Sequence, residues 1–349
     1  MARFHLVVQE AFNFRRRQPE ETSIRSFVGF VIILVTSISI YMIRPESQNV
    51  TDYTNNNTIF MVWNFKDNLE IGDSFNQLCK LVINLNNSVN VRFPVSRASC
   101  VMGIGHDAWL RLNLPNPLPK ELVNFTPITG IKHTAVASRG DLHFHIRADT
   151  TSICYDMAAA ISAILDPVAT GIEEIHGFRY WDSRSILGFV DGTENPQGQD
   201  RDFFAIVGDD DSIYKGGSYL FVQKYIHDLA AWKRLSVEEQ EKVIGRYKPN
   251  DIEMADDVKP ANSHIALANV GDDLKIVRDN MPFGKMSTNE MGTYFIAYAS
   301  TFSTVQKMLT NMFIGSPTGN YDRILDFSTA KTGSLFFVPT FDMLDVFSN

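Results

Sequence analysis

The chain has 349 residues, enough for one large domain or two of ordinary size. Lys and Arg number 32 against 40 for Asp and Glu, which gives a formal charge of −8. A nucleic-acid partner is therefore not expected, because binding to phosphates needs a clustered basic face. The three cysteines, Cys79, Cys100 and Cys154, are widely spaced, which excludes a disulfide scaffold, a CxxC-type zinc site and a CxxCH haem attachment.

Residues 1–57 form an N-terminal extension that carries six basic and five acidic residues, so the acidity belongs to the rest of the chain. Within it, residues 27–43 are uncharged. As a helix this run would span roughly 25 Å, at the lower limit for a bilayer core. Three arginines at 15–17 precede it, so the positive-inside rule places everything after residue 44 across the membrane. We therefore predict a transmembrane helix over 26–43 that acts as a single-pass anchor.

Other interpretations of this run stay open. A cleaved signal peptide would usually show a small-residue cleavage site, which is missing, and a twin-arginine signal would have its arginines nearer the run. The many Ile and Val residues favour a buried helix or strand pair, in which case the expected location is the cytoplasm. Sequons that agree with a lumenal side without proving it follow at Asn49, Asn56, Asn86 and Asn124.

The folded body is expected to begin near Ile59, after a polar, Asn-rich linker over 45–57. In its first part the patterns predict, in order, a strand over 59–65, a helix from a cap at Asp73 to about Leu85, a strand-like stretch over 91–105 broken at Pro94, a strand over 142–148 and a helix over 152–165. In its second part they predict strand or buried segments over 218–226, 264–270, 273–279 and 292–300, and helices over 236–245 and 303–314. A Gly-rich phosphate fingerprint is lacking, so we predict an α+β fold with mostly antiparallel sheets.

Three features could carry chemistry, and each also has a purely structural interpretation. The stretch GFVDGTENP, residues 188–196, joins an apolar strand end to strong turn dipeptides, as in a hairpin turn. His264 begins a strand-like run, where a lone histidine is usually structural. Arg278 closes an apolar strand, where an arginine commonly snorkels to the surface or forms an ion pair.

Taken together, the motifs of the body resemble those of dye-decolorising peroxidases of the bacterial B-type subfamily. They occur in the family's order from about Ile59 to Phe347: IHGFRYWDSRS, GFVDGTENP, GGSYLFVQKYIHDL, SHIAL, KIVRDNMPFG and GTYFIAYAS. The resemblance implies a peroxidase domain over 58–349. It would consist of two ferredoxin-like halves, about 58–180 and 181–349, forming one dimeric α+β barrel-like unit with haem b in the C-terminal half.

The resemblance also implies roles for individual residues. His264 would be the proximal iron ligand, and Asp191, Arg278 and Asn280 would be catalytic groups on the distal side. Gly192 and Thr193, with Arg278, would contact the haem. A neutral imidazole leaves one axial position of the iron for peroxide, and a carboxylate on its other nitrogen would raise its basicity, although the sequence does not say which acid does this.

The residue types on the distal side suit the chemistry of peroxide. A carboxylate at Asp191 can move a proton from the inner to the outer peroxide oxygen, as base and then acid. Arg278 would supply a fixed positive charge. Many relatives have an arginine three residues after the proximal histidine, where this chain has Leu267, so the resemblance leaves the anchoring of the haem propionates open.

The implied function is a haem peroxidase that reduces hydrogen peroxide and oxidises a small organic, dye-like or phenolic reductant by one-electron steps. Relatives commonly assemble, so a homo-oligomer is expected. Trp181 and Trp232 could relay electrons, although packing is the simpler interpretation of both. The alternatives are a haem carrier or a protein that releases iron from porphyrin, and a membrane-tethered interaction domain without cofactor.

Overall fold

The computed structural model describes residues 45–349. The transmembrane helix predicted over 26–43 lies outside the described residues, as do the arginines before it. Within 45–349, no helix combines the length and the apolar character that crossing a membrane requires.

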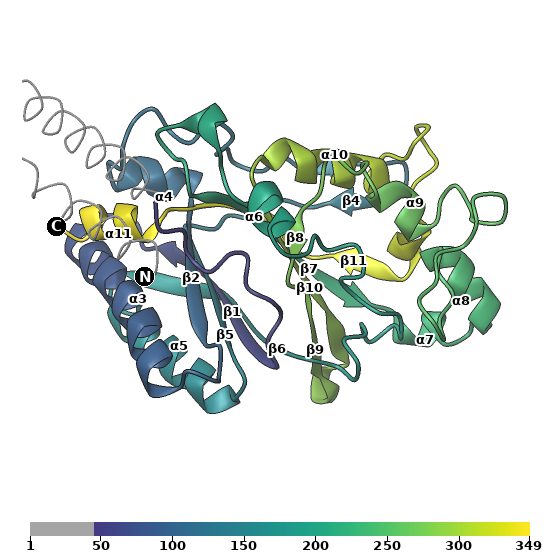
Figure 1. Cartoon of the computed structure of the whole chain (residues 1–349), viewed down its shortest axis with the longest axis horizontal. Coiled ribbons are helices and arrows are strands. Elements are labelled where there is room, and N and C mark those ends of the chain that lie inside the picture. The colour runs from purple at the N-terminus through teal and green to yellow at the C-terminus, as the bar shows by residue number, and fades with distance from the viewer. Residues whose placement is uncertain (1–44) are drawn as a thin grey trace, which may run out of the picture. The chain divides into compact units, whose positions relative to one another are not determined.

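One curved antiparallel sheet of ten strands forms the centre of the described part of the chain (Figure 1). Its strands pair in the order β6-β1-β5-β2-β12-β7-β10-β8, while β11 pairs with β7 and β9 with β10. The strands are β1 (Asn57–Phe65), β2 (Ser99–Gly105), β5 (Leu142–Ala148), β6 (Ala169–Phe178), β7 (Ser218–His227), β8 (Val277–Arg278), β9 (Met281–Lys285), β10 (Glu290–Ala299), β11 (Ser328–Ala330) and β12 (Ser334–Val338). A separate small sheet joins β3 (Ile128–Thr129) to β4 (Thr134–Ala135).

The sheet repeats one strand order twice. Numbered along the chain within each half, β6-β1-β5-β2 and β12-β7-β10-β8 both read 4-1-3-2, the order of a ferredoxin-like unit. The halves join where Phe336 and Phe337 of β12 pair with Gly105 and Ile104 of β2. The halves also approach each other at β6, the first strand of the path, and β9, which pairs with β10: a Cβ on Gly177 of β6 would lie 2.5 Å from the Cβ of Met281 of β9. The predicted α+β fold of two ferredoxin-like halves in a barrel-like unit is confirmed.

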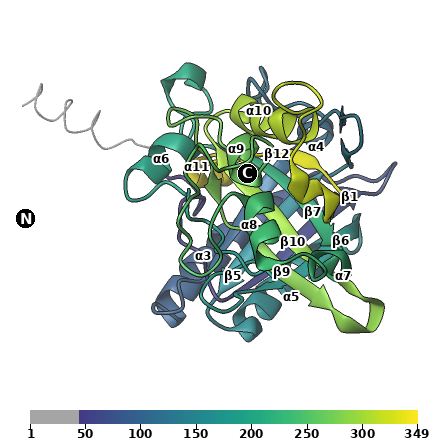
Figure 2. The same ribbon diagram turned by 90° about the vertical axis from the view of Figure 1, so that its right-hand side faces the viewer.

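Helices cover the outside of the sheet (Figure 2). In the N-terminal half α3 (Gly72–Arg92) and α5 (Thr151–Leu165) pack on β2, β1 and β5, and in the C-terminal half α10 (Phe302–Phe313) packs on β7 and β10. The shorter helices are α4 (His106–Arg111), α6 (Asp200–Ala205), α7 (Leu229–Trp232), α8 (Val237–Ile244), α9 (His264–Ala268) and α11 (Phe341–Phe347). Helix α8 has the ends its sequence predicts, with a Ser236 capping box and Gly245 at φ 94°.

The strand LHFHIRA, β5, divides two cores. Its apolar residues Leu142, Phe144 and Ile146 belong to the core beneath the helices. The alternate residues His143, His145 and Arg147 point into the space between the two halves, where each is at most 1% exposed. The alternation therefore predicts the strand correctly, but its polar face is covered by the second half of the sheet rather than by water.

Residues 45–57, predicted as a linker, are instead packed against the body. Gln48 is buried; its side-chain oxygen accepts a hydrogen bond from the Met102 N–H (2.8 Å), and its amide donates to the carbonyls of Met102 and Pro339. Val50 and Asn55 are also buried. The compact unit therefore begins at Pro45 rather than near residue 59.

Some predicted element ends are wrong. Helix α3 begins at Gly72 without a side-chain cap from Asp73, and it continues to Arg92, so the first residues of the stretch predicted as strand-like over 91–105 are helical. Residues 273–279 contribute only the two residues of β8. The run at 264–270, predicted as a strand or buried segment, begins with the short helix α9. So short an apolar run has no periodicity that separates a helix from a strand, which is why the sequence could not identify it.

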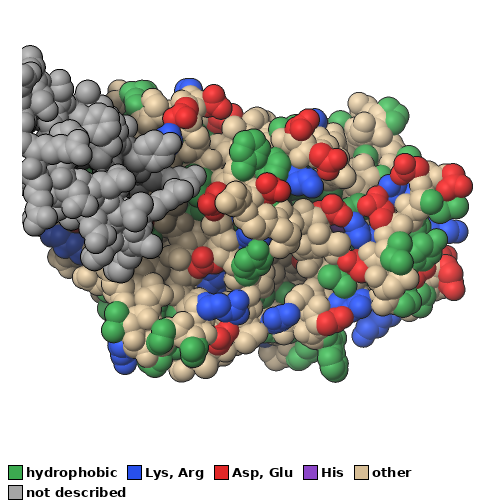
Figure 3. All heavy atoms as spheres, in the orientation of Figure 1, with side chains coloured by type: hydrophobic (Ala, Val, Ile, Leu, Met, Phe, Trp, Pro, Cys, Tyr) green, Lys and Arg blue, Asp and Glu red, His purple; other side chains and the backbone are tan. Residues whose placement is uncertain are grey.

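Exposed charges of both signs are interspersed on the face drawn in Figure 3. Several form surface ion pairs, such as Lys215 with Asp209. Pairs of this kind contribute little to stability in water, so the cores on either side of the sheet hold the fold together.

The sequons differ in accessibility. Asn86 is buried in α3, and its side chain exchanges hydrogen bonds with the backbone N–H and C=O of Cys100, so it is closed to glycosylation in the folded protein. Asn56 and Asn124 are exposed.

All three cysteines are buried and unpaired. Cys79 lies on α3, Cys100 on β2 and Cys154 on α5. Burial raises the pKa of each thiol to about 12.

Buried histidines predict that the fold loses stability in acid. Burial lowers the pKa of His143 to about 3 and of His227 to about 4, and it lowers that of His145 well below the ordinary value. Below about pH 6.5 these histidines are protonated in the unfolded chain but stay neutral in the folded protein. The free energy of unfolding therefore falls as the pH drops from about 6.5 to 4, by about 1.4 kcal/mol per pH unit for each histidine. The melting temperature measured between pH 7.5 and 4.5 should fall accordingly.

A substitution of His143 tests this prediction. Neither ring nitrogen has a hydrogen-bond partner within residues 45–349, and the ring stacks on Tyr294 (centroids 6.3 Å apart). His143→Phe should therefore fold and make the melting temperature less dependent on pH. The exposed His176 provides the control, since His176→Phe should leave the dependence unchanged. Equal slopes for wild type and His143→Phe would contradict the prediction.

Candidate active site

A cavity of about 1510 Å³, counting the space at its open mouth, lies in the C-terminal half. All of its lining residues fall between Ser185 and Ser328, so the N-terminal half contributes none of them. Its apolar wall includes Leu187, Phe189, Ile265, Ile276, Phe295, Met308, Leu309, Met312 and Ile324, and polar and charged side chains also line the cavity. Such a lining suits a large, mostly apolar ligand that carries some polar groups.

His264, the first residue of α9, lines this cavity. Its Nδ1 lies 2.7 Å from Oδ2 of Asp322, whose side chain is fully buried. The other oxygen of Asp322 accepts a hydrogen bond from the Ile324 N–H (2.9 Å), so the carboxylate is fixed. This arrangement holds the proton on Nδ1 and leaves Nε2 as the nitrogen that can bind a metal.

The loop that carries Asp191 is irregular and is not the hairpin turn that the turn dipeptides of residues 188–196 favour. Only an isolated bridge between Arg184 and Val190 precedes Asp191, whose N–H donates to the Ser183 carbonyl (2.9 Å). Gly192 follows at φ 89°, a conformation that glycine adopts at little cost. The Asp-Gly pair thus turns the chain at the cavity wall, which Asp191, Gly192 and Thr193 all line.

Asn195 attaches this loop to the strand that carries Arg278. Its side-chain oxygen accepts a hydrogen bond from the Arg278 N–H (2.9 Å), and its amide donates to the Arg278 carbonyl (2.8 Å). The Asn195 side chain thus bonds both backbone groups of Arg278, as a neighbouring strand would. Asp191 and Arg278, 87 positions apart in the sequence, therefore reach the same cavity.

Asn280 is oriented toward Asp191. Its side-chain oxygen accepts from the Ile296 N–H of β10 (3.1 Å), which leaves its amide to donate to the two Asp191 oxygens at 3.2 and 3.4 Å. Arg278 and Asn280 both line the cavity with His264. The structure thus brings all six residues predicted for the site to one cavity.

Basic groups on the cavity wall are Arg246, Lys275 and Arg278. Arg246 already forms ion pairs with Glu194 and Glu253. Leu267 is buried and lies outside the cavity lining, so this position supplies no charge to the cavity.

Sequence reasoning missed Asp322 and Asn195. Asp322 is 58 positions from His264, and its only local signal is that of a cap, since it precedes the short helical turn Arg323–Asp326. Asn195 lies within GFVDGTENP, where the Asn-Pro pair indicates only a turn. Of the two tryptophans considered as electron relays, Trp232 is buried, with its Nε1 donating to the Leu187 carbonyl, and Trp181 is 77% exposed.

Comparison with known proteins gives consistent matches over most of the chain. The family model described as Dyp-type peroxidase, N-terminal, matches residues 47–179, and that described as Dyp-type peroxidase, C-terminal, matches residues 182–343. The chain is 52% identical over 265 residues to the dye-decolorizing peroxidase of Rhodococcus erythropolis, which covers 75% of this chain and 77% of that protein. It is also 52% identical over 262 residues to that of Mycobacterium tuberculosis, which covers 74% and 78%.

Solved structures agree with these matches. A dye-decolorizing peroxidase from Bacteroides thetaiotaomicron has a TM-score of 0.86 and 51% identity, and the match covers 88% of this chain and 99% of that one. A DypB variant from Rhodococcus jostii in complex with heme has a TM-score of 0.80 and 44% identity, with coverage of 86% and 97%.

Proposed function

The chain belongs to the Dyp-type peroxidase family and is a haem-dependent peroxidase; from this premise we propose that His264, Asp191, Arg278 and Asn280 carry its reaction. The observation that supports the proposal most directly is their convergence on one apolar cavity, from a helix, a loop and two adjoining strand ends. Gly192 and Thr193 belong to the same assignment as haem contacts.

The residues of the cavity fit haem. The imidazole of His264, whose Nε2 is free, would bind the haem iron, and the apolar wall suits a macrocycle. We assign the haem carboxylates to Lys275 and Arg278. Arg246 is already held by two glutamates, whereas the partner of Lys275 is the exposed Asp272 at 3.5 Å, which a haem carboxylate would replace. When bound, the haem supplies the iron that binds peroxide and exchanges single electrons with a reductant.

On the distal side we assign proton movement to Asp191. Its carboxylate would take the proton from the inner peroxide oxygen and return it to the outer one, so that the outer oxygen could leave as water when the O–O bond breaks, with the two electrons supplied by the haem. The amide of Asn280 donates to this carboxylate and holds it in place. Arg278 would supply a fixed positive charge that stabilises the negative charge developing on the departing oxygen.

On the proximal side we assign a supporting role to Asp322. Its buried carboxylate accepts the hydrogen bond of His264 Nδ1, which fixes the ring and makes Nε2 a stronger ligand. This is the acid that the sequence alone leaves unidentified.

An absorption spectrum of the purified haem-loaded protein, with and without hydrogen peroxide, tests the function. A peroxidase should show a Soret band that changes on addition of peroxide and returns as a phenolic or dye-like reductant is oxidised. A haem carrier or a protein that removes iron from porphyrin would show a Soret band without turnover. A Soret band that does not change with peroxide would contradict the assignment of the four residues to peroxide chemistry.

We also propose that residues 27–43 anchor the protein in a membrane, with the peroxidase domain on the non-cytosolic side. The length and lack of charge of the run and the arginines before it support this. The protein should then stay in the membrane fraction after alkaline washing, and replacing two central residues by arginine, as in Ile33→Arg with Val35→Arg, should release it. Release of the wild-type chain by alkali would contradict the anchor and favour the cytoplasmic alternative.

We also propose that the peroxidase domain forms a homo-oligomer, as the family resemblance implies. One structural neighbour is an encapsulated DyP-type peroxidase from Mycobacterium smegmatis, with a TM-score of 0.83 and 46% identity.

A further inference from the structure

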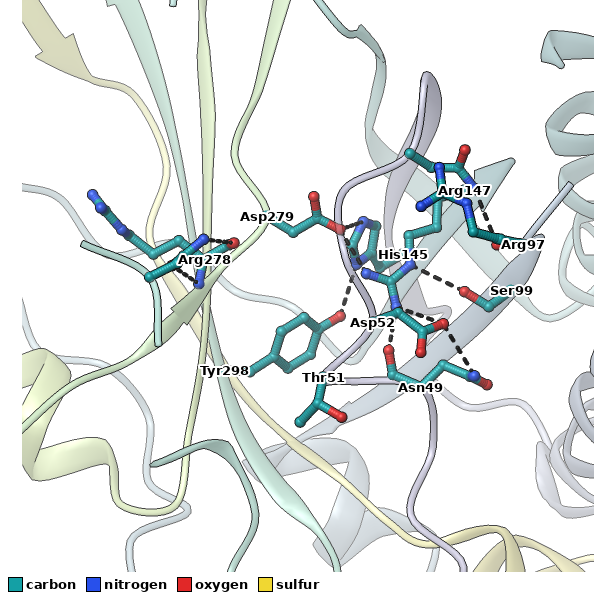
Figure 4. Close-up of polar contacts among 12 residues, drawn as sticks. Asn49, Thr51, Asp52, Arg97, Ser99, His145, Arg147, Arg278, Asp279 and Tyr298 are labelled. Carbon is teal, nitrogen blue, oxygen red and sulfur yellow. Dashed lines mark hydrogen bonds and ion pairs between the residues drawn. The ribbon is translucent and has the colours of Figure 1, made fainter. Parts of the chain in front are cut away.

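Residues 278–280, which lead from the end of β8 to β9, point in two different directions. Arg278 and Asn280 line the cavity, whereas Asp279 between them is 2% exposed and points away from it, as expected for alternate residues of an extended chain. Figure 4 shows Asp279 directed toward Arg147 and His145, and Arg278 directed away from them. One carboxylate thus lies behind two residues of the site.

Asp279 forms a buried ion pair with the N-terminal half. Its Oδ2 lies 2.6 Å from Nη1 of Arg147 on β5, and both side chains are 1% exposed. The same oxygen lies 3.5 Å from Nε2 of His145, whose Nδ1 is hydrogen-bonded to the Tyr298 hydroxyl at 2.8 Å. Asp279 therefore faces a guanidinium and an imidazole that are both fixed by other contacts.

Arg147 is itself held on every side (Figure 4). Its Nε donates to the Ser99 hydroxyl of β2 (3.0 Å), and its Nη2 donates to the Asn49 carbonyl and lies 3.7 Å from the Asp52 carboxylate. Asn49 and Asp52 belong to the packed N-terminal segment. The guanidinium thus connects that segment, the N-terminal sheet and the strand behind the cavity.

We propose that Arg147 and Asp279 are positioning residues of the active site, through which the N-terminal half, although it lines no part of the cavity, holds Arg278 and Asn280 in place. The inference rests on the distal roles proposed above. Oδ1 of Asp279 has no hydrogen-bond partner within residues 45–349, so Arg147 is the main compensation for this buried charge. Removing one partner of a buried ion pair leaves an uncompensated charge that the segment would shift to relieve. Displacement of a reacting group by about 1 Å can cost ~100-fold in rate.

A matched pair of variants tests this. Asp279→Asn removes the charge behind the cavity. Asp141→Asn removes another carboxylate that is 2% exposed and paired with an arginine (Arg139, 3.0 Å), but within the N-terminal half. In the haem-loaded protein, Asp279→Asn should slow the peroxide-induced Soret change ~10- to 100-fold, whereas Asp141→Asn should leave it unchanged even if it lowers the melting temperature equally. Arg147→Lys, which keeps a charge for Asp279, should be slowed less than Arg147→Met.

Hydrogen–deuterium exchange gives a second readout. In haem-loaded Asp279→Asn, exchange should rise in the segment 277–283 and stay unchanged in β7, while Asp141→Asn should leave 277–283 unchanged. Equal rates and equal exchange for the two variants would overturn the inference. If Arg278→Ala and Asn280→Ala do not slow the reaction, the proposed distal roles fail; if they do and Asp279→Asn does not, the positioning role alone fails.

Discussion

Asp191→Ala is expected to slow the reaction of the haem-loaded protein with hydrogen peroxide by about 10²- to 10⁴-fold, the usual contribution of a positioned acid–base group. Asp191 is the one carboxylate of the cavity that Asn280 holds with its amide, and alanine leaves the peroxide proton without a carrier. Stopped-flow measurement of the Soret change against peroxide concentration gives the second-order rate constant directly.

Two further variants sharpen this result. Arg278→Ala should also slow the step, whereas Arg278→Lys should recover part of the rate because a positive charge returns. Asp209→Ala, which removes an exposed carboxylate outside the cavity lining, serves as the control and should react like wild type. A wild-type rate constant for Asp191→Ala would show that another group moves the proton.

His264→Ala is expected to lose haem, or to keep it without its axial ligand. No other histidine of the described chain except His227 lines the cavity, and both ring nitrogens of His227 are already hydrogen-bonded to hydroxyls. The haem-to-protein ratio after gel filtration and the absorption spectrum measure the effect. Asp322→Asn should retain haem with an altered spectrum. The neutral amide oxygen accepts the Nδ1 hydrogen bond more weakly than the carboxylate does, so the imidazole is a weaker ligand.

The exposed His176 offers a control for this substitution, and His176→Ala should bind haem normally. A high-spin ferric spectrum of His264→Ala identical to that of wild type would contradict the assignment of His264 as the ligand.

Much of the fold follows from local patterns. Alternation over 142–148 predicts β5, and the capping residues Ser236 and Gly245 predict the ends of α8, because these signals depend only on nearby residues. The pattern could not tell that the polar face of β5 is buried, since the second half of the sheet that covers it is distant in sequence. The Asn-rich start at 45–57 was expected to be a linker for the same reason: its partners, such as Met102 and Pro339, are far along the chain.

The site shows the same division. The residues predicted for it from a family resemblance converge on one cavity, but composition and spacing alone would favour structural explanations for His264 and Arg278. Asp322, Asn195 and Arg147 gain their meaning only from contacts at 58, 83 and 132 positions of separation. Such contacts depend on the tertiary arrangement, which a single sequence does not encode in any local period.

The burial of the three cysteines has a consequence for the lifetime of the enzyme during turnover. Peroxide oxidises thiolates far faster than thiols. A protein that turns over peroxide therefore risks oxidation of any accessible cysteine. Because burial raises the pKa of each thiol to about 12, the thiols stay protonated at pH 7, and no solvent reaches the three side chains. Self-inactivation by conversion of cysteine to sulfenic or sulfinic acid is therefore suppressed by the packing around Cys79, Cys100 and Cys154.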